Sequence, residues 1–275
     1  MDNVILSLCI PTYNRVEYLR ELLPALIAEV EAGNRVAVQV ELLISNNAST
    51  DETESYLSTL SCLGLSVYRN AENIGGDRNF LACVERASGM YVWLFGDDEL
   101  IVPGGIARIL KLLSKEHPIL VILRDGKQEL GVAEEVIYPN FGICVREEMK
   151  DEGVFALSHT LITANIFHKD IFDQKEAVSK LYTNYAHMYG LLNGLKRGGR
   201  IVMKTGVFRS REQRAQFDHW PAALCVKQAG YLWRLAEAFD VPRLRRIAFR
   251  LALNLPVEIL SCCAHKVFPR RFGRT

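Results

Sequence analysis

Three adjacent carboxylates, Asp97, Asp98 and Glu99, come directly after the apolar run Tyr91–Phe95. Such carboxylates repel one another unless a cation or hydrogen bonds offset the repulsion. Hard divalent cations such as Mg²⁺ and Mn²⁺ prefer carboxylate oxygens and readily bridge to phosphates. The triplet therefore predicts a metal site with all three residues as ligands. The alternative interpretation is a solvated turn that caps the next helix.

Three other polar turns follow apolar runs earlier in the chain, at residues 11–15, 45–51 and 73–79. Backbone amides of the first turn, at a strand-to-helix junction, suit a nucleotide base or a phosphate. The second turn offers short amides and hydroxyls for hydrogen bonds to a base. The glycines of the third let the backbone approach a ligand, and its Arg78 is suited to a phosphate. Each turn alone is also compatible with an ordinary structural role.

These four turns belong to a regular alternation of strands and helices. The apolar runs 5–10, 38–44, 65–68 and 91–95 predict strands, separated by segments with helical periodicity. We expect Pro11 to stop the first strand, Asn14 with Glu17 to cap the first helix, and Gly89 to close a helix over 77–88. Alternation of this kind favours an α/β fold, with a mostly parallel sheet flanked by helices on both faces. Ligands then bind at the carboxyl ends of the strands, where the four turns meet.

Beyond residue 100 the pattern is weaker, but it still alternates. Helices are predicted over 106–113, 177–196, 222–239 and 243–264, and strands over 119–123 and 161–167. We therefore predict one domain over residues 1–220, followed by a helical appendage over 221–275. Within the domain, residues 1–115 form the nucleotide-binding half and 116–220 the acceptor half.

Charge is unevenly distributed along the 275 residues, although the formal net charge is only +1. Residues 243–275 hold eight Lys and Arg and a single acid, Glu258. The near-neutral whole excludes bulk attraction to nucleic acid. The basic end, with its apolar helical periodicity, predicts a helix that lies on an anionic membrane surface. The alternative is a helix packed on the domain, followed by a basic end.

Composition also bears on the compartment. The seven cysteines form no C-x-x-C pair, and Cys9 and Cys83 stand in apolar stretches, which is typical of reduced core thiols. The chain starts without the basic and apolar runs of a signal peptide, and it has no apolar run long enough to span a bilayer. We expect a cytoplasmic protein, peripheral on the inner face of the cell membrane.

The four turns together carry a resemblance. Pro11-Thr12-Tyr13-Asn14-Arg15, the turn over 44–51, Asn73-Ile74-Gly75-Gly76 and the turn over 95–99 occur in the order and spacing of the family 2 glycosyltransferases. Leu94-Phe95-Gly96-Asp97-Asp98-Glu99 is similar to the abequosyltransferase-like branch, whose members build bacterial O-antigen and other surface polysaccharides. The resemblance implies the Rossmann-like GT-A fold and sugar transfer from a nucleoside-diphosphate sugar to a saccharide acceptor. It further implies an inverting displacement and a divalent metal, Mn²⁺ or Mg²⁺. A basic end on an anionic membrane would suit an acceptor linked to a polyprenyl lipid.

The resemblance also implies roles for individual positions. The residues expected to bind the nucleotide sugar are Pro11, Thr12, Tyr13, Arg15, Asn46, Asn47, Ser49, Asp51, Gly76, Arg78 and Asp97. Asn46 stands where the family commonly has an Asp that contacts the base. Phe95 stands where the family has the first acid of its metal motif, so metal binding rests on Asp97, Asp98 and Glu99.

The sequence identifies the base that removes the acceptor proton less clearly than it identifies the donor site. In the family it is an acid at a helix start, some eighty to ninety residues after the metal motif. Here that region reads Asn184-Tyr185-Ala186-His187, without a carboxylate. We predict His187 and Asp151 as catalytic residues, with Glu152 and Asp173 as alternative bases. His187 is also compatible with a metal or phosphate ligand, or with a packed side chain of a helix.

Two other functions remain open at this stage. A nucleotidyltransferase also combines an α/β sheet with a carboxylate-held metal, but it needs a Gly-rich basic loop after the first strand, which residues 11–15 lack. A catalytically silent nucleotide-sugar-binding or scaffold protein is compatible with Phe95, Asn46 and the unmarked base.

Overall fold

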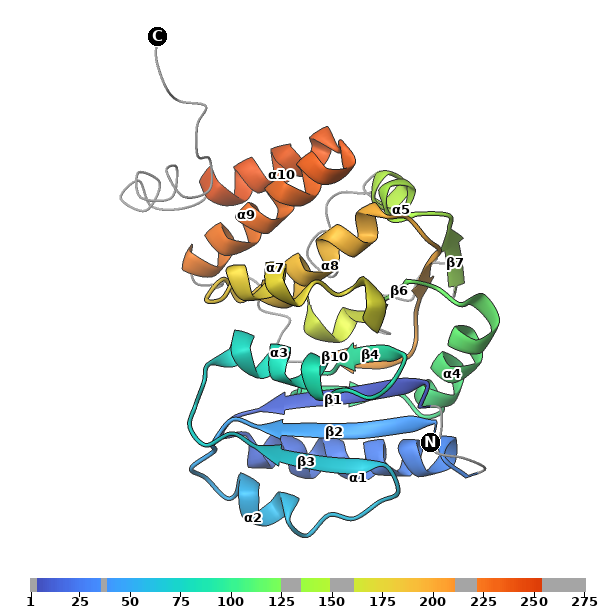
Figure 1. The fold of residues 1–275 in the computed structure, drawn as a ribbon, viewed down its shortest axis with the longest axis vertical. Helices are drawn as coiled ribbons and strands as arrows, with labels where there is room; N and C mark the ends of the chain where they lie inside the picture. The colour runs from blue at the N-terminus through green and yellow to red at the C-terminus, as the bar shows by residue number, and fades with distance from the viewer. Residues whose placement is uncertain (1–3, 36–38, 125–134, 149–160, 211–221, 254–275) are drawn as a thin grey trace.

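An eight-stranded sheet runs through the centre of the protein (Figure 1). The computed structural model describes residues 4–35, 39–124, 135–148, 161–210 and 222–253. The strands, in sheet order, are β3 (Leu65–Arg69), β2 (Val40–Asn46), β1 (Leu6–Thr12), β4 (Tyr91–Leu94), β8 (Asn165–His168), β6 (Leu120–Leu123), β9 (Ile201–Lys204) and β7 (Glu135–Tyr138). β8 and β7 are antiparallel to their neighbours, and the other pairs are parallel. A separate pair joins β5 (Glu99–Ile101) to β10 (Phe208–Ser210).

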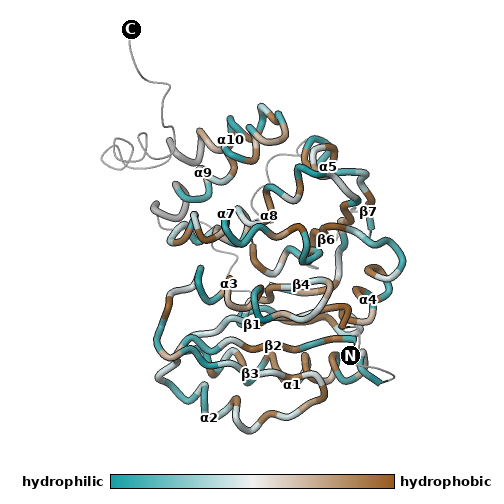
Figure 2. The backbone as a smooth tube through the Cα atoms, viewed as in Figure 1, coloured by the Kyte–Doolittle hydropathy of each residue, from teal (hydrophilic) through white to brown (hydrophobic). Residues whose placement is uncertain are grey.

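Helices cover both faces of this sheet. The helices are α1 (Val16–Gly33), α2 (Thr53–Leu57), α3 (Gly76–Arg86), α4 (Gly105–Glu116), α5 (Phe141–Glu148), α7 (Gln174–Ser179), α8 (Ala186–Lys196), α9 (Ala222–Phe239) and α10 (Pro242–Leu253). One apolar core lies between the sheet and α1 with α4, and the other lies between the sheet and α3, α5, α8, α9 and α10. Figure 2 shows apolar residues along the central strands and polar residues on outer elements such as the short helix α2. This arrangement confirms the predicted α/β fold.

Three predictions in the first half need correction. β1 continues through Pro11 to Thr12. The Cys9 carbonyl accepts from Phe95 on the β4 side, and the β4 register ends at Cys9, so the missing N–H of Pro11 interrupts no ladder. Asn14 does not cap α1; it has a φ of +52°, and its side chain accepts from the Thr50 amide at 2.8 Å. Gly89 does not close α3, which ends at Arg86 with Ala87 as its C-cap. An added Cβ at Gly89 would lie 2.6 Å from the Ser7 backbone nitrogen. Close approach to β1 explains that glycine.

The second half departs further from the prediction. The single helix predicted over 177–196 is two helices, α7 and α8, separated by a turn over 180–185. The strand predicted over 161–167 begins with a short 3₁₀ segment, Ile162–Ala164, and the strand itself is β8. β8 inserts antiparallel between β4 and β6. Periodicity alone did not identify this insertion, because a fully buried strand has the same apolar composition in either direction.

The appendage shares the core of the domain. Tyr231 and Leu235 of α9, and Leu244 and Ala248 of α10, are buried in the same core as α8. Leu244 and Ala248 therefore pack inward, as the alternative interpretation expects, while Phe249 of the same helix is 47% exposed. Membrane association of the basic end stays a prediction. Residues 254–275, with half of the basic cluster, lie outside the described residues. Among the described helices, none combines the length and apolar composition needed to cross a membrane.

Candidate donor-binding site

A cavity of about 380 Å³ opens where β1, β2 and β4 end. Its lining comes from the β1–α1 turn, the segment after β2, the start of α3 and the acidic turn after β4. The lining residues are Pro11, Thr12, Tyr13, Arg15, Asn47, Asn73, Gly75, Gly76, Asn79, Phe80 and Asp97. The four turns singled out in the sequence thus meet at one site, because parallel strands place their carboxyl ends at one sheet edge.

Seven of the eleven predicted nucleotide-sugar-binding residues line this cavity, and Asn46, Ser49, Asp51 and Arg78 do not. Asn46 is fully buried and donates to Glu54 at 2.6 Å. The Ser49 hydroxyl accepts from the Asn14 amide at 2.9 Å, and Asp51 accepts from the Val16 amide at 3.3 Å. Asn46 thus ties the end of β2 to α2, while Ser49 and Asp51 tie the segment after β2 to the β1–α1 turn and the start of α1. Arg78 is exposed on α3. Ligand contacts by these four residues stay a prediction.

Asp51 illustrates the electrostatics of this turn. Partial burial raises the pKa of the Asp51 carboxyl, but hydrogen bonds from Thr53 and from the Val16 amide outweigh burial and hold the pKa below its ordinary value. The charged form is therefore the stable one. A carboxylate that accepts from the first turn of α1 also complements the positive end of that helix.

The acidic turn after β4 is held in place by contacts from Thr12, Arg15 and Thr163. The Thr12 hydroxyl donates to Asp97 Oδ2 at 2.8 Å, and Arg15 Nη1 lies 3.5 Å from Asp98 Oδ2 and 4.0 Å from Asp97 Oδ1. The Asp97 and Asp98 side chains are 13% and 18% exposed. Gly96 donates from its amide to Thr163 Oγ1 at 2.9 Å. This contact adds a third support from the acceptor half.

Glu99 differs from its two neighbours. It begins β5, its side chain is fully buried, and it does not line the cavity. Across the described parts of the chain, no three His, Cys, Asp or Glu side chains gather as a metal-binding group. The pair Asp97 and Asp98 still fits a divalent ion, because Mg²⁺-type ions take one or two carboxylates and complete their shell with water and phosphate oxygens. Glu99 as a ligand stays a prediction.

Behind the cavity, amide side chains form a buried hydrogen-bond network. Asn79 Oδ1 accepts from Ser45 Oγ at 2.7 Å and from Asn70 Nδ2 at 3.0 Å, and Asn79 Nδ2 donates to the Ser45 carbonyl at 3.0 Å. Arg86 donates to Ser45 Oγ at 3.1 Å and to Asn70 Oδ1 at 3.3 Å. Asn79 and Asn70 are 2% and 6% exposed. Buried polar groups satisfied in this way rigidify the wall they belong to.

This network fixes Asn47 at the cavity wall. Asn47 Oδ1 accepts from the Ile74 amide and from Asn70 Nδ2, both at 3.0 Å, and Asn47 Nδ2 donates to Asn73 Oδ1 at 2.8 Å. Because a backbone N–H can only donate, the Asn47 atom that faces Ile74 is the oxygen. One hydrogen of Asn47 Nδ2 is donated to Asn73. Because the network fixes the orientation of the Asn47 amide, it also fixes the direction in which Nδ2 can donate its second hydrogen.

Four lining residues were not among the predicted binding residues: Asn73, Gly75, Asn79 and Phe80. Asn73 and Gly75 belong to the third polar turn, which the sequence singled out. Asn79 belongs to the third polar turn, but its type alone suggested only a loop residue. Phe80 stands one helical turn after Gly76, so both lie on the same face of α3, and this spacing is the signal that identifies Phe80 as a lining residue. Phe80 also lies between the cavity and His187 of the acceptor half.

The predicted catalytic residue His187 lies next to this wall. It is 3% exposed in the first turn of α8, and its ring meets the Phe80 ring edge-on, with 5.6 Å between ring centres. Asp173 instead caps α7: hydrogen bonds from Asn193 and from the Glu176 amide hold the pKa of Asp173 below its ordinary value. Asp151 and Glu152 lie outside the described residues. His187 and Asp151 therefore stay predictions as bases.

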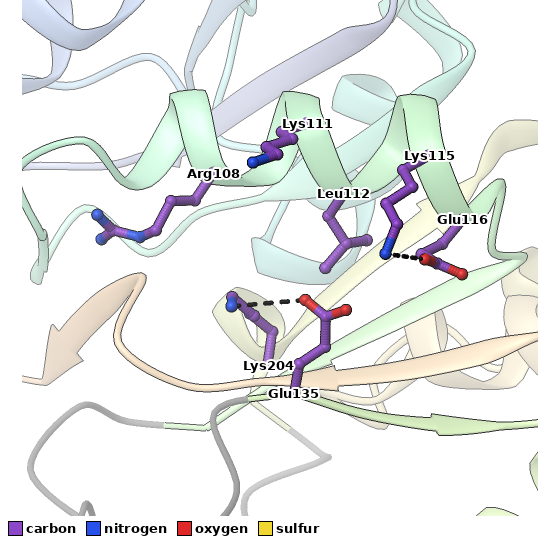
Figure 3. Close-up of a pocket in the computed structure, with 7 residues that line it drawn as sticks. All are labelled: Arg108, Lys111, Leu112, Lys115, Glu116, Glu135 and Lys204. Carbon is purple, nitrogen blue, oxygen red and sulfur yellow. Dashed lines mark ion pairs between the residues drawn. The ribbon is translucent and has the colours of Figure 1, made fainter.

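A second hollow, of about 330 Å³, lies between α4 and the strands β9 and β7 (Figure 3). Lys204 pairs with Glu135 at 3.5 Å, and Lys115 pairs with Glu116 at 2.8 Å. Arg108 donates to the Pro103 and Gly206 carbonyls. The first pair joins β9 to β7, the second lies within α4, and Arg108 links α4 to the Gly206 carbonyl after β9, so we interpret the hollow as a structural junction.

Residues 7–172 match the family described as Glycosyl transferase family 2. The match covers more than half of the chain. The chain belongs to glycosyltransferase family 2. Abequosyltransferase RfbV of Salmonella typhimurium is 38% identical over 119 residues, which are 42% of this chain and 34% of RfbV. The chain thus matches about a third of the length of that relative.

Two solved structures show that this family 2 chain shares its fold with other glycosyltransferases. S. aureus TarS 1-349 in complex with UDP-GlcNAc has a TM-score of 0.64 at 15% identity, over 96% of this chain and 80% of TarS. The mannosyltransferase PcManGT from Pyrobaculum calidifontis, in complex with GDP-Man and Mn²⁺, has a TM-score of 0.55 at 14% identity, over 98% of this chain and 77% of PcManGT. These similarities confirm the predicted GT-A fold.

Proposed function

We propose that this protein transfers a sugar from a nucleoside-diphosphate sugar to a saccharide acceptor during synthesis of a bacterial surface polysaccharide. The cavity carries the proposal, because the Asp97 carboxylate and the Asn47 amide both line it, at the edge where α/β sheets bind ligands. Family 2 membership and the similarity to an abequosyltransferase support this function. So do the nucleotide sugars held by TarS and PcManGT.

In this proposal the two walls bind different parts of the donor. Asn47, held by the buried amide network, donates to a carbonyl group of the base. Gly75 and Gly76 lack a Cβ, and open space surrounds the Cβ position of Gly75, which lets the backbone approach the ribose and diphosphate. Arg15 lies beside the acidic turn, where its guanidinium also attracts phosphate oxygens.

Asp97 and Asp98 would hold the divalent ion, Mn²⁺ or Mg²⁺. Such an ion, when bound, neutralises the charge that develops on the diphosphate leaving group. Thr12 and Arg15 orient the two carboxylates, so the turn is preorganised before the donor binds.

The proposed reaction is a single-step inverting displacement. A hydroxyl oxygen of the acceptor attacks the anomeric carbon, the bond from that carbon to the diphosphate oxygen breaks, and a base takes the hydroxyl proton. His187 is the candidate base nearest the cavity wall among the described residues, through its contact with Phe80. Asp151 is the second candidate. The buried position of His187 requires that the acceptor enter beside Phe80.

Titration calorimetry with UDP-GlcNAc, UDP-glucose and GDP-mannose, each with Mn²⁺, tests the donor site. We expect at least one of them to bind the wild-type protein and to bind Asp97→Ala at least about tenfold more weakly. Asp170→Asn is the matched control, because this side chain is 89% exposed. Binding of no nucleotide sugar, or equal binding by Asp97→Ala, would contradict the proposal.

Product analysis separates the other two functions. A silent binding protein binds a donor but neither hydrolyses nor transfers its sugar, and fully buried Phe95, packed on Trp93, is the feature that favours it. A nucleotidyltransferase releases pyrophosphate from a nucleoside triphosphate and a sugar phosphate. Release of a nucleoside diphosphate together with a glycosylated acceptor would exclude both.

We further propose that the acceptor is polyprenyl-linked and that the protein works on the inner face of the cell membrane. The eight cations in residues 243–275 support this. Co-sedimentation with phosphatidylglycerol vesicles, compared with phosphatidylcholine vesicles, tests it. Equal binding to both vesicles, or binding that persists at high salt, would contradict an electrostatic association.

A further inference from the structure

The turn between α7 and α8, residues 180–185, presents an aromatic side chain to solvent. Tyr182 is 74% exposed, the largest value for any large apolar side chain in the described residues. Burying a tyrosine normally contributes a substantial gain in free energy. Because Tyr182 is exposed, folding does not use this free energy, and a ligand that covers the ring can gain it.

The backbone of this turn is unusual. Tyr182 has a φ of +69° and Asn184 a φ of +64°, in the left-handed region that disfavours side chains larger than glycine. The conformation costs Tyr182 free energy, whereas an asparagine such as Asn184 adopts it more readily. Two such residues within three positions persist only when the surroundings determine the conformation. The turn is therefore held in one shape.

Hydrogen bonds within the turn provide part of that hold. Thr183 donates from its hydroxyl to the Lys180 carbonyl at 2.7 Å, and the Tyr185 amide donates to Thr183 Oγ1 at 3.1 Å. A contact from outside the turn also stabilises its conformation: the Asn184 amide donates to Asp77 Oδ2 at 3.0 Å.

Asp77 connects this turn to the donor cavity. It is 8% exposed in the first turn of α3, directly after Gly76, which lines the cavity. Burial raises the pKa of Asp77, while the backbone N–H groups of Asn184, Ala186 and Tyr182 act in the opposite direction. One helical turn further on, Phe80 lines the same cavity and meets His187 of α8. The contact from Asp77 to the turn, together with that from Phe80 to the first turn of α8, thus places the turn beside the donor cavity.

The chemistry of the turn points to a neutral polar ligand. Thr183 and Asn184 are uncharged, and Lys180 is engaged by Glu176 at 3.9 Å and by the ring of Tyr189 at 5.7 Å. A tyrosine combines a flat apolar face with a polar tip. A sugar ring has the matching surface, with an apolar C–H face and a rim of hydroxyls.

We propose that Tyr182 binds the acceptor saccharide by stacking on one of its sugar rings, and that Asp77 is the positioning residue that holds Tyr182 beside the donor cavity. This inference rests on the proposed transfer function. It assigns the outer wall of the acceptor site to the 180–185 turn, which runs directly into the region 184–187 where the sequence analysis places the base.

Saturation-transfer NMR with methyl α-D-mannoside, methyl α-D-galactoside and methyl α-L-rhamnoside tests the stacking residue. We expect at least one glycoside to bind the wild-type protein in the presence of UDP and Mn²⁺. We expect Tyr182→Ala to weaken that binding at least about fivefold and Tyr182→Phe to retain it. Phe249→Ala is the matched control, since Phe249 is an aromatic residue of α10 with 47% exposure. Unchanged binding by Tyr182→Ala, or no glycoside bound by the wild type, would overturn the assignment.

The same variants separate this inference from the proposed function. We expect Tyr182→Ala to bind nucleotide sugars as tightly as the wild type in calorimetry. Asp77→Ala should weaken glycoside binding and raise the acceptor KM more than the donor KM, with circular dichroism unchanged. An equal rise in both KM values would assign Asp77 a general structural role and contradict its positioning role. Loss of donor binding by the wild type itself would instead contradict the proposed function.

Discussion

Thr12 and Asp97, 85 residues apart in the chain, are joined by a hydrogen bond of 2.8 Å from the Thr12 hydroxyl to Asp97 Oδ2. The bond links the carboxyl end of β1 to the acidic turn after β4. Thr12 is 2% exposed, so this bond is shielded from water. A hydrogen bond to a charged group contributes about 1.5–3 kcal/mol. The contact therefore determines which way the Asp97 carboxylate faces.

Thr12→Val should lower the rate of sugar transfer by roughly tenfold, because valine keeps the shape of threonine and removes the donor to Asp97. Steady-state kinetics with a bound donor measures this effect. Thr12→Ser keeps the hydroxyl and should retain most of the activity. A Thr12→Val enzyme as active as the wild type would show that Asp97 needs no support from β1.

Asp97→Asn should reduce transfer more severely, by roughly 10²–10³-fold, because the amide keeps the volume but loses the charge next to the leaving group. Arg15 would then lie near one carboxylate, Asp98, in place of two. The rate should not recover as Mn²⁺ is raised. Recovery to the wild-type rate at high Mn²⁺ would indicate that Asp97 only increases metal affinity, and an undiminished rate would remove it from the site.

The donor site was largely predictable because its residues follow strands. Pro11, Thr12, Asn47 and Asp97 come directly after apolar runs, and parallel pairing brings the ends of those runs together. Asn46 and Ser49 have the same types and the same spacing but face inward, toward Glu54 and the Asn14 amide. Side-chain direction depends on turn geometry, such as the φ of +58° at Ala48, which residue types do not reveal.

The acceptor half was less predictable for a different reason. Its elements are joined by long-range contacts, such as that between Asp77 and Asn184, 107 residues apart. No local pattern indicates that a carboxylate on α3 meets the start of α8. The break between α7 and α8 was missed because the apolar periodicity continues from Ala177 to Leu195, although Tyr182 and Asn184 adopt left-handed conformations.

Asn79→Ala should destabilise the fold and weaken donor binding together. The change removes three buried hydrogen bonds, two that Ser45 Oγ and Asn70 Nδ2 donate to Asn79 Oδ1 and one that Asn79 Nδ2 donates to the Ser45 carbonyl, which costs about 3 kcal/mol in the free energy of unfolding. It also releases Asn70, which holds Asn47 at the cavity wall. Urea unfolding and calorimetry measure the two effects.

Asn73→Ala is the matched comparison for Asn79→Ala, because Asn73 is exposed and contacts Asn47 from the solvent side. We expect it to weaken donor binding with little change in the free energy of unfolding. If Asn79→Ala alters stability but leaves nucleotide affinity intact, the buried network does not position Asn47.

The pH dependence of stability should distinguish two aspartates with opposite surroundings. Burial raises the pKa of Asp77 above its ordinary value of 3.8, so the folded state holds this proton more tightly than the unfolded chain. The contribution of Asp77 to the free energy of unfolding is therefore largest below about pH 3.8 and declines as pH rises through the raised pKa. Wild type should consequently lose stability relative to Asp77→Asn between acidic and neutral pH.

Asp173 should give the reverse result, because hydrogen bonds from Asn193 and the Glu176 amide lower its pKa. Its contribution is present above the ordinary value of 3.8 and is lost as pH falls through the lowered pKa. Wild type should therefore gain stability relative to Asp173→Asn as pH rises. Urea unfolding of the three proteins from about pH 2 to pH 7 measures both slopes, because the Asp173 change falls below its ordinary pKa of 3.8 and the Asp77 change above it. The other carboxylates cancel in each difference. Equal slopes for the two variants would show that the Asn184 amide compensates the burial of Asp77, and that the anchor of the 180–185 turn is fully charged.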